Sequence, residues 1–118
     1  MLSSGLIALA ARCSSRFRYP LGVYLNTTLQ CNAACRYCSI STLSRRLPAA
    51  MDTAAAHRLV RQMARAGVRK LNFTGGEPLC HPDCDSLFAE AAAAGLFVVL
   101  STNGMLIPQH RTALRHVH

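Results

Sequence analysis

The sequence contains no tryptophan and few acidic residues. Five Asp and Glu residues stand against 13 Lys and Arg residues, so the formal net charge is +8, and the first acid is Asp52. A net positive charge of this size is found in many nucleic-acid-binding proteins. The arginines before Asp52 are not interleaved with aromatic residues in a stacking pattern, so we do not expect nucleic acid as a partner. The alternatives are solvated arginine faces, or a positive surface that attracts an anionic ligand or an acidic partner.

A long apolar run is also missing. The longest one near the start, residues 6–11, is much shorter than the ~20 residues that a membrane span needs, so we expect no membrane association. Residues 1–20 are rich in Ser and Arg and contain no acid, which is typical of an organellar transit peptide or of a bacterial N-terminal tail. We favour the tail and a cytoplasmic location, with an organelle as the alternative. Residues 21–118 are long enough for one domain.

The six cysteines are unevenly spread, and no secretory leader of the usual build precedes them. Three of them fall within residues 31–38. This bunching favours a metal or cluster site in a reducing compartment over paired disulfides. Cys13, in the N-terminal segment, is expected to be a free thiol.

Hydrophobic periodicity predicts alternating strands and helices. Each predicted helix has a capping residue before it and a glycine after it, and no hairpin signal separates the strands, so we expect a parallel α/β arrangement. The predicted order is a strand at 23–29, a loop at 39–51, a helix from Asp52 or Thr53 to Gly67, a strand at 69–74, a helix from Asp83 to Gly95, a strand at 96–100 covered on both faces, and the start of a helix near Pro108.

Three strand–helix units make up less than half of a (βα)8 barrel, which has ~250 residues. Three parallel strands alone would also leave exposed edges. The expected fold is therefore a partial (βα) TIM-like barrel of about three units, and we expect the chain to be a fragment of a larger barrel.

Cys31, Cys35 and Cys38 follow the first predicted strand, separated by three and two residues. Three thiolates on a 4Fe-4S cluster leave one iron open to bind another ligand. The alternative is a zinc site that uses the last two of these cysteines and two further ligands. Because zinc ribbons usually supply two such pairs and this chain has one, we favour the cluster. The candidates for the further zinc ligands are Cys31, Cys80, His81 and Cys84.

The segment CNAACRYC at residues 31–38 resembles the three-cysteine motif of the radical S-adenosylmethionine (radical SAM) family, which also has an aromatic residue before its third cysteine. GGEP at residues 75–78 and STNG at residues 101–104 are similar to two further motifs of that family, each after a strand. The resemblance covers roughly residues 23–107 and implies the N-terminal part of a radical SAM core domain, with all three motifs at the carboxyl ends of barrel strands.

The resemblance also implies ligands. Cys31, Cys35 and Cys38 would hold the 4Fe-4S cluster, and S-adenosylmethionine (SAM) would chelate its open iron. The glycines let the backbone approach a ligand closely, and Glu77 offers negative charge to the methionine ammonium. Ser101 and Asn103 would contact the ribose or the methionine carboxylate, or would cap a turn. The residues implied to bind SAM are Tyr37 (against the adenine), Gly75, Gly76, Glu77, Ser101 and Asn103.

The reaction implied by the resemblance is reductive cleavage of SAM to a 5′-deoxyadenosyl radical, which takes a hydrogen atom from a substrate. The substrate class would be a peptide or a small-molecule cofactor precursor, and an electron donor such as flavodoxin or ferredoxin is expected. The alternatives are a non-catalytic zinc-binding or iron–sulfur electron-transfer module, or an inactive truncated product.

Other residues with metal or redox chemistry lie outside these motifs. Cys80, His81 and Cys84 follow the second motif and suggest a redox or second-metal role, although a free thiol is the default interpretation. The three histidines near the end are interpreted as polar tail residues. They are His110, His116 and His118.

Overall fold

The computed structural model describes residues 20–44, 46 and 49–118. The Ser- and Arg-rich N-terminal segment, with Cys13, lies outside the described residues apart from Pro20. No helix in the described ranges is long and apolar enough to cross a lipid bilayer.

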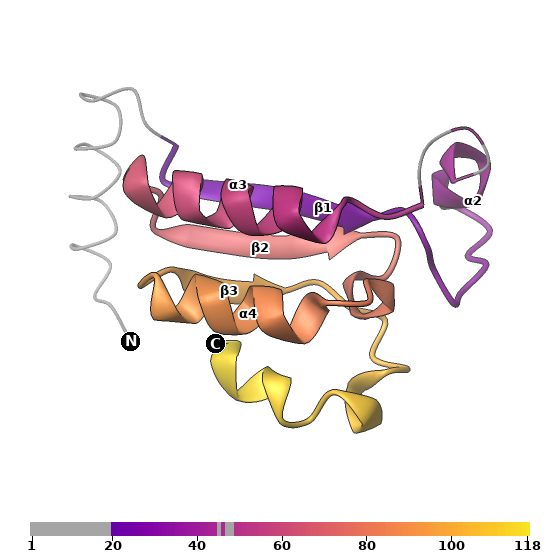
Figure 1. The fold of residues 1–118 in the computed structure, drawn as a ribbon. Coiled ribbons are helices and arrows are strands. Elements are labelled where there is room, and N and C mark those ends of the chain that lie inside the picture. Colours follow the sequence, from indigo (N-terminus) through magenta and orange to yellow (C-terminus); the bar gives the residue numbers. More distant parts are fainter. Residues whose placement is uncertain (1–19, 45, 47–48) are drawn as a thin grey trace.

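A three-stranded parallel sheet forms the centre of the fold (Figure 1). Its strands are β1 (Gly22–Thr28), β2 (Lys70–Gly75) and β3 (Phe97–Leu100), in the spatial order β1-β2-β3. The register pairs Val23 with Leu71, and Leu71 with Val98. Sequential strands lie side by side in parallel, as repeated strand–helix units require. The predicted strands and the α/β class are therefore confirmed.

Two helices cover one face of the sheet (Figure 1). They are α3 (Thr53–Arg65) and α4 (Cys84–Ala93). Phe73 of β2 and Phe88 of α4 meet edge to face with their ring centroids 4.8 Å apart, and both are fully buried. Burial of such side chains is the main favourable term in folding. The buried apolar residues form one cluster that contains Leu25, Ala56, Val60, Val68, Leu71, Phe73, Leu79, Cys84, Leu87, Phe88, Ala91, Leu96, Val98 and Ala113.

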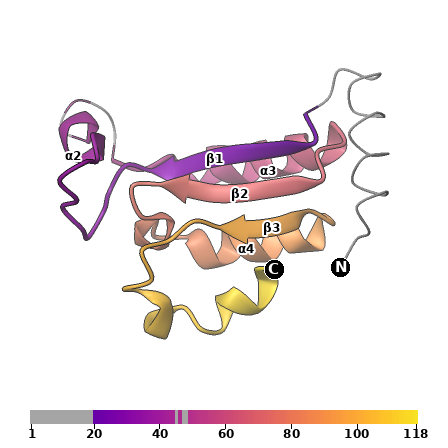
Figure 2. The same ribbon diagram turned by 180° about the vertical axis from the view of Figure 1, so that it is seen from behind.

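The opposite face of the sheet carries no helix among the described residues (Figure 2). Tyr24 of β1 is 73% exposed and Phe97 of β3 is 45% exposed. The ring of Phe97 stacks on His118, with the centroids 4.4 Å apart. The apolar run of β3 predicts a strand covered on both faces, but in the part of the chain described here only one face is covered.

The helix ends follow their capping residues. Asp52 accepts a hydrogen bond from the Ala55 amide at 3.0 Å and starts α3, and Gly67 follows its end with φ +89°. Asp83 is the N-cap of α4, but its carboxylate makes no capping bond; it accepts from the hydroxyl of Thr53 at 2.5 Å. That contact joins the starts of the two helices.

Short helices replace two of the expected features. Residues 39–51, predicted to be a loop, include the four-residue helix α2 (Ile40–Leu43). Instead of a third α-helix, the end of the chain forms two 3-10 helices, η2 (Ile107–Gln109) and η3 (Ala113–His116). A further 3-10 turn, η1 (Pro78–Cys80), follows β2. Pro at the first turns of η1 and η2 supplies no backbone donor, which short turns tolerate.

Candidate functional site at the carboxyl edge of the sheet

The three sequence motifs meet at one edge of the sheet. Each follows the carboxyl end of its strand, and the cysteine segment with α2 extends beyond the ends of β1 and β2 (Figures 1 and 2). Parallel strands end at the same edge, so motifs 26 or more residues apart in the sequence come together there.

The cysteine segment is a closed loop with a hydrogen-bonded neck. The Met51 amide donates to the Thr27 carbonyl at 2.8 Å, and the Leu29 amide donates to the Ala49 carbonyl at 2.6 Å. The Thr28 hydroxyl also donates to the Ala49 carbonyl, at 2.6 Å. These bonds return the chain to the end of β1, so the loop is anchored to the sheet at its base while its tip projects into solvent.

All three loop cysteines line one cavity of ≈ 300 Å³. Cys31, Cys35 and Cys38 are free thiols and are exposed to solvent. Within the loop, the Cys38 amide donates to the Cys35 carbonyl at 3.1 Å, and this turn reverses the chain between the two side chains. The cavity is also lined by Gly76 of the second motif, and its remaining walls are Leu29, Ala33, Ala34, Ile40 and Ser44.

Gly75 and Gly76 allow a close approach between backbones. The Gly75 φ is +135°, and a Cβ there would lie 2.2 Å from the Thr28 carbonyl oxygen. A Cβ on Gly76 would lie 2.3 Å from the Gln30 carbonyl oxygen. The Gly76 amide donates to Thr28 at 2.9 Å. The sequence predicts close approach to a ligand; the structure shows that the glycines also seat the second motif directly against the start of the cysteine loop.

Glu77 is 1% exposed, and its carboxylate accepts three hydrogen bonds. Oε1 accepts from the Leu79 amide at 3.0 Å and from the Thr102 hydroxyl at 2.8 Å. Oε2 accepts from the Asn103 amide at 2.8 Å. A buried carboxylate needs such partners to offset the cost of its desolvation. Glu77 therefore joins the second motif to the third.

The third motif bonds to both of the others. The Asn103 side-chain amide donates to Oδ1 of Asn32 in the cysteine loop at 2.8 Å and lies 4.0 Å from the Cys31 sulfur. Its own Oδ1 accepts from the Met105 amide at 3.0 Å, which caps a turn. The Ser101 hydroxyl donates to Oδ1 of Asn72 at 3.1 Å.

Sequence reasoning singled out neither Thr102 nor Asn72. Thr102 stands inside the third motif, between the two residues that were chosen, and its hydroxyl donates to Glu77. Asn72 lies between Leu71 and Phe73 in β2 and is 6% exposed. The alternation of Lys70, Asn72 and Thr74 with apolar residues predicts a solvent-facing side, so the sequence carries no signal that Asn72 is buried.

Three further candidates, Tyr37, Cys80 and His81, do not line the cavity. Tyr37 is 94% exposed and does not line the cavity. His81 is buried: its Nδ1 accepts from the Asp83 amide at 3.1 Å, so Nε2 carries the proton and donates to the Met51 carbonyl at 2.9 Å. Both of its ring nitrogens are therefore engaged in the fold. The pKa of Cys80 is raised by burial, with smaller contributions from Glu77 and Cys31.

The loop cysteines fit a cluster better than a single ion. In the described ranges, no group of three ligand atoms within 4.8 Å of one another includes a loop cysteine. A zinc ion draws its ligand atoms to one point, at about 2.0–2.3 Å from the metal. In a 4Fe-4S cluster each thiolate binds a different iron, so three sulfur atoms spread around one cavity suit the larger group.

Comparison with known proteins identifies the family. A family profile described as "Radical SAM superfamily" matches residues 25–116. The PqqA peptide cyclase of Xanthomonas campestris pv. campestris (strain B100) is 42% identical over 86 residues, which is 73% of this chain and 23% of that protein. The PqqA peptide cyclase of Rhodopseudomonas palustris is 35% identical over 97 residues, which is 82% of this chain and 26% of that protein.

Solved structures show the same fold. Streptococcus suis SuiB bound to the precursor peptide SuiA matches with a TM-score of 0.71 and 21% identity, over 94% of this chain and 26% of SuiB. SuiB bound to S-adenosylmethionine matches with a TM-score of 0.69 and 20% identity, over 92% of this chain and 25% of SuiB. The chain thus spans about a quarter of the length of the proteins it matches. With the profile match over most of its length, this chain belongs to an enzyme family, the Radical SAM superfamily.

Proposed function

We propose that this chain is the part of a radical SAM enzyme that binds the 4Fe-4S cluster and SAM, and that the enzyme modifies a precursor peptide. The observation that carries the proposal is the single cavity lined by Cys31, Cys35, Cys38 and Gly76. Three cysteine ligands and the glycine motif, which come from two different strand ends, contribute to one site.

The cysteines hold three of the four irons in this proposal. Their exposure lets each thiol lose its proton to water when iron binds, as metal ligation requires. The hydrogen-bonded neck between Thr27 and Met51 holds the loop at the sheet edge. Among the described residues, no fourth cysteine lines the cavity, so one iron of a cluster bound there would keep an open coordination position for SAM.

The second and third motifs bind SAM. Gly75 and Gly76 present backbone groups beside the cysteine loop, while Glu77 places a buried negative charge beneath them. Glu77 is buried and already accepts three hydrogen bonds from this chain, so in this proposal the backbone makes the direct contact with the methionine ammonium and the carboxylate attracts it electrostatically. Asn103 and Ser101 bind the carboxylate or ribose, and Tyr37, whose exposed ring lies outside the cavity lining, contacts the adenine where SAM extends beyond the cavity.

Held by Cys31, Cys35 and Cys38, a reduced 4Fe-4S cluster would supply the one electron needed for reductive cleavage of SAM to methionine and a 5′-deoxyadenosyl radical, which would take a hydrogen atom from the substrate. The positive charge of the chain, +8, suits docking of an acidic electron donor such as flavodoxin or ferredoxin. Free thiols suit a reducing compartment, which we take to be the cytoplasm.

The peptide substrate is proposed from the relatives. PqqA peptide cyclases match in sequence, and SuiB bound to its precursor peptide matches in fold. The matched region covers about a quarter of each of these relatives, so we expect the remaining substrate contacts to come from outside the residues that match.

Anaerobic reconstitution with iron and sulfide tests the cluster. We expect about four irons per chain and an absorption band at about 400 nm, and both should be lost on Cys35→Ala. Cys80→Ala is the matched control, because Cys80 does not line the cavity. Addition of SAM to the dithionite-reduced protein should perturb its electron paramagnetic resonance spectrum. One tightly bound zinc per chain that Cys35→Ala abolishes, with no cluster, would instead support the zinc module and overturn the proposal.

A further inference from the structure

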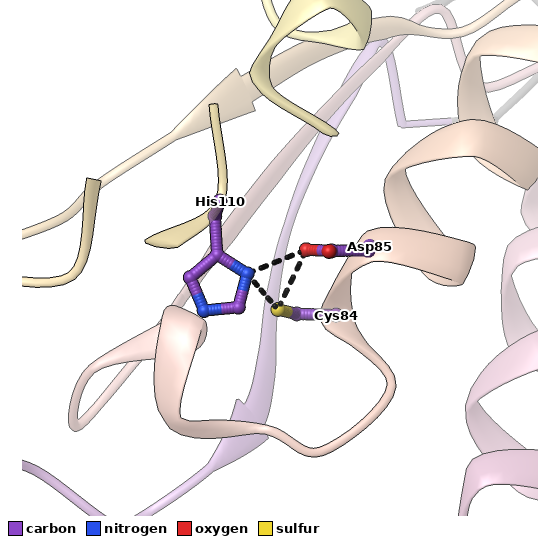
Figure 3. A group of neighbouring side chains, drawn as sticks. All are labelled: Cys84, Asp85 and His110. Carbon is purple, nitrogen blue, oxygen red and sulfur yellow. Dashed lines mark hydrogen bonds and ion pairs between the residues drawn. The ribbon is translucent and has the colours of Figure 1, made fainter. Parts of the chain in front are cut away.

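A second group of ligand atoms lies away from the cysteine loop (Figure 3). It consists of Cys84 and Asp85, at the start of α4, and His110, just after η2. The Cys84 sulfur lies 3.7 Å from Nδ1 of His110 and 3.4 Å from Oδ1 of Asp85. Nδ1 of His110 lies 2.7 Å from the same Oδ1. Sulfur, nitrogen and oxygen thus form a small triangle.

The pattern of contacts argues against a nucleophilic relay. In a cysteine–histidine–carboxylate triad, one ring nitrogen takes the thiol proton while the other is held by the carboxylate. Here the thiol and the carboxylate both face Nδ1. Cys84 is also only 2% exposed, which keeps its sulfur from bulk solvent. Three ligand atoms of different side chains within 4.8 Å of one another are close enough to share one metal ion.

The size of the triangle suits zinc. Tetrahedral Zn²⁺ with Zn–S of about 2.3 Å and Zn–N and Zn–O of about 2.0–2.2 Å separates sulfur from nitrogen or oxygen by about 3.5 Å, and nitrogen from oxygen by about 3.4 Å. The two separations that involve the Cys84 sulfur, 3.7 and 3.4 Å, agree with this geometry. The 2.7 Å pair of His110 and Asp85 is a direct hydrogen bond that would open by about 0.7 Å to admit the ion.

We propose that Cys84, Asp85 and His110 bind one Zn²⁺ ion and leave its fourth position to water. Asp85 is the exposed member, with 56% of its side chain accessible, so it gives the ion and the water a path to the site. Binding releases the Cys84 proton to solvent. In this proposal Cys84 is a zinc ligand instead of a free thiol, and His110 is a zinc ligand instead of a polar tail residue.

The ion would tie the end of the chain to α4. Cys84 and Asp85 start the helix, while His110 belongs to the segment that follows the third motif (Figure 3). The third motif itself is bonded to Glu77 through the Asn103 amide. Zinc bound here would stabilise the segment behind the proposed SAM site without contacting the cysteine loop.

Metal titration of the full chain with Cys31, Cys35 and Cys38 all replaced by Ala tests this site, because the loop thiols are then absent. We expect one Zn²⁺ per chain, and Co²⁺ in its place should give a thiolate-to-cobalt charge-transfer band. Cys84→Ala and His110→Gln should each weaken binding at least about tenfold. Zn²⁺ should also raise the melting temperature of the triple variant and not that of its His110→Gln form.

Matched controls lie close by. Cys80→Ala removes a neighbouring thiol and His116→Gln another histidine of the same segment, and both should leave zinc affinity unchanged. Circular dichroism checks that each variant folds. If Cys84→Ala does not fold, the zinc affinity of His110→Gln tests the site instead, because His110 is partly exposed. Absence of zinc binding in the triple variant, or binding that survives His110→Gln at full strength, would overturn the proposal.

Discussion

The buried carboxylate of Glu77 accepts a hydrogen bond from the backbone amide of Asn103, 26 residues further along the chain, at 2.8 Å. The bond links the turn after β2 to the turn after β3. Through its side chain, Asn103 then reaches Asn32 in the cysteine loop. One carboxylate thus holds all three strand-end loops in a common arrangement.

Glu77→Gln should destabilise the protein although it keeps the size of the side chain. The Leu79 and Asn103 amides donate to different oxygens of Glu77, and Gln has only one oxygen. The NH2 group of Gln would therefore face one of these amides, and two hydrogen-bond donors would oppose each other. We expect a loss of about 2–3 kcal/mol in the free energy of unfolding, measured in urea. Thr102→Val removes one bond to the same carboxylate and the bond that the Thr102 hydroxyl accepts from the Gly104 amide, and it should cost about 1–2 kcal/mol. Equal stability of wild type and Glu77→Gln would show that the carboxylate does not hold these turns.

Gly76→Ala should disrupt the contact between the second motif and the cysteine loop. The new methyl group would lie 2.3 Å from the Gln30 carbonyl oxygen, and backbone atoms cannot move aside cheaply. We expect a loss of about 3 kcal/mol together with reduced iron incorporation. Gly22→Ala is the control, since its Cβ would meet Lys70 at an ordinary 3.6 Å. Thermal unfolding and iron analysis of both variants check this, and a Gly76→Ala chain as stable as Gly22→Ala would contradict it.

The cysteines should differ sharply in reactivity. Burial, followed by a hydrogen bond with Asp85, raises the pKa of Cys84 to about 12. At pH 8 roughly one Cys84 in ten thousand would be a thiolate, the form that reacts with iodoacetamide. In metal-free protein with EDTA, the exposed Cys31, Cys35 and Cys38 should label first and Cys84 only after unfolding. Peptide mass spectrometry measures the order, and rapid labelling of Cys84 in the native state would contradict the burial argument.

Acid should weaken the contact between α3 and α4. Burial alone would raise the pKa of Glu90, but hydrogen bonds from His57 and Arg61 outweigh it and lower that pKa below 4.5. Because the folded-state pKa is depressed, the stabilisation is present above the unfolded-state pKa and is lost as pH falls through the folded-state value. Glu90→Gln should therefore cost about 0.5–1 kcal/mol at pH 7 and nothing at a pH below the folded-state pKa. Urea unfolding at several pH values measures this difference. Arg58→Ala, an exposed change on α3, the helix that carries His57 and Arg61, should show no such pH dependence.

Much of the fold follows from local features of the sequence. Asp52 caps α3 and Gly67 ends it, because a short acceptor and a residue that tolerates positive φ are what helix ends require. The apolar periodicity predicted both helices, whose buried faces include Val60 and Phe88. Motif order alone indicated the Radical SAM superfamily, which the comparisons confirm.

The helical end of the chain was beyond local reasoning. An α-helix was expected near Pro108, where η2 and η3 form instead. Packing of Ala113 and Val117 against the core, and the His118 amide bonded to the Val98 carbonyl at 2.9 Å, favour this path over an isolated helix. Propensity is a weak preference that such long-range contacts override.

The spacing of Cys31, Cys35 and Cys38, the glycines of the second motif and the alternation of strands and helices were all determined by the sequence by itself. Only the tertiary structure decided that the buried carboxylate of Glu77 accepts a hydrogen bond from the Asn103 amide, and that the Cys84 sulfur lies next to the His110 ring. The physical reason is that parallel strands bring distant segments to one edge, and which side chains then meet depends on packing that no local pattern encodes.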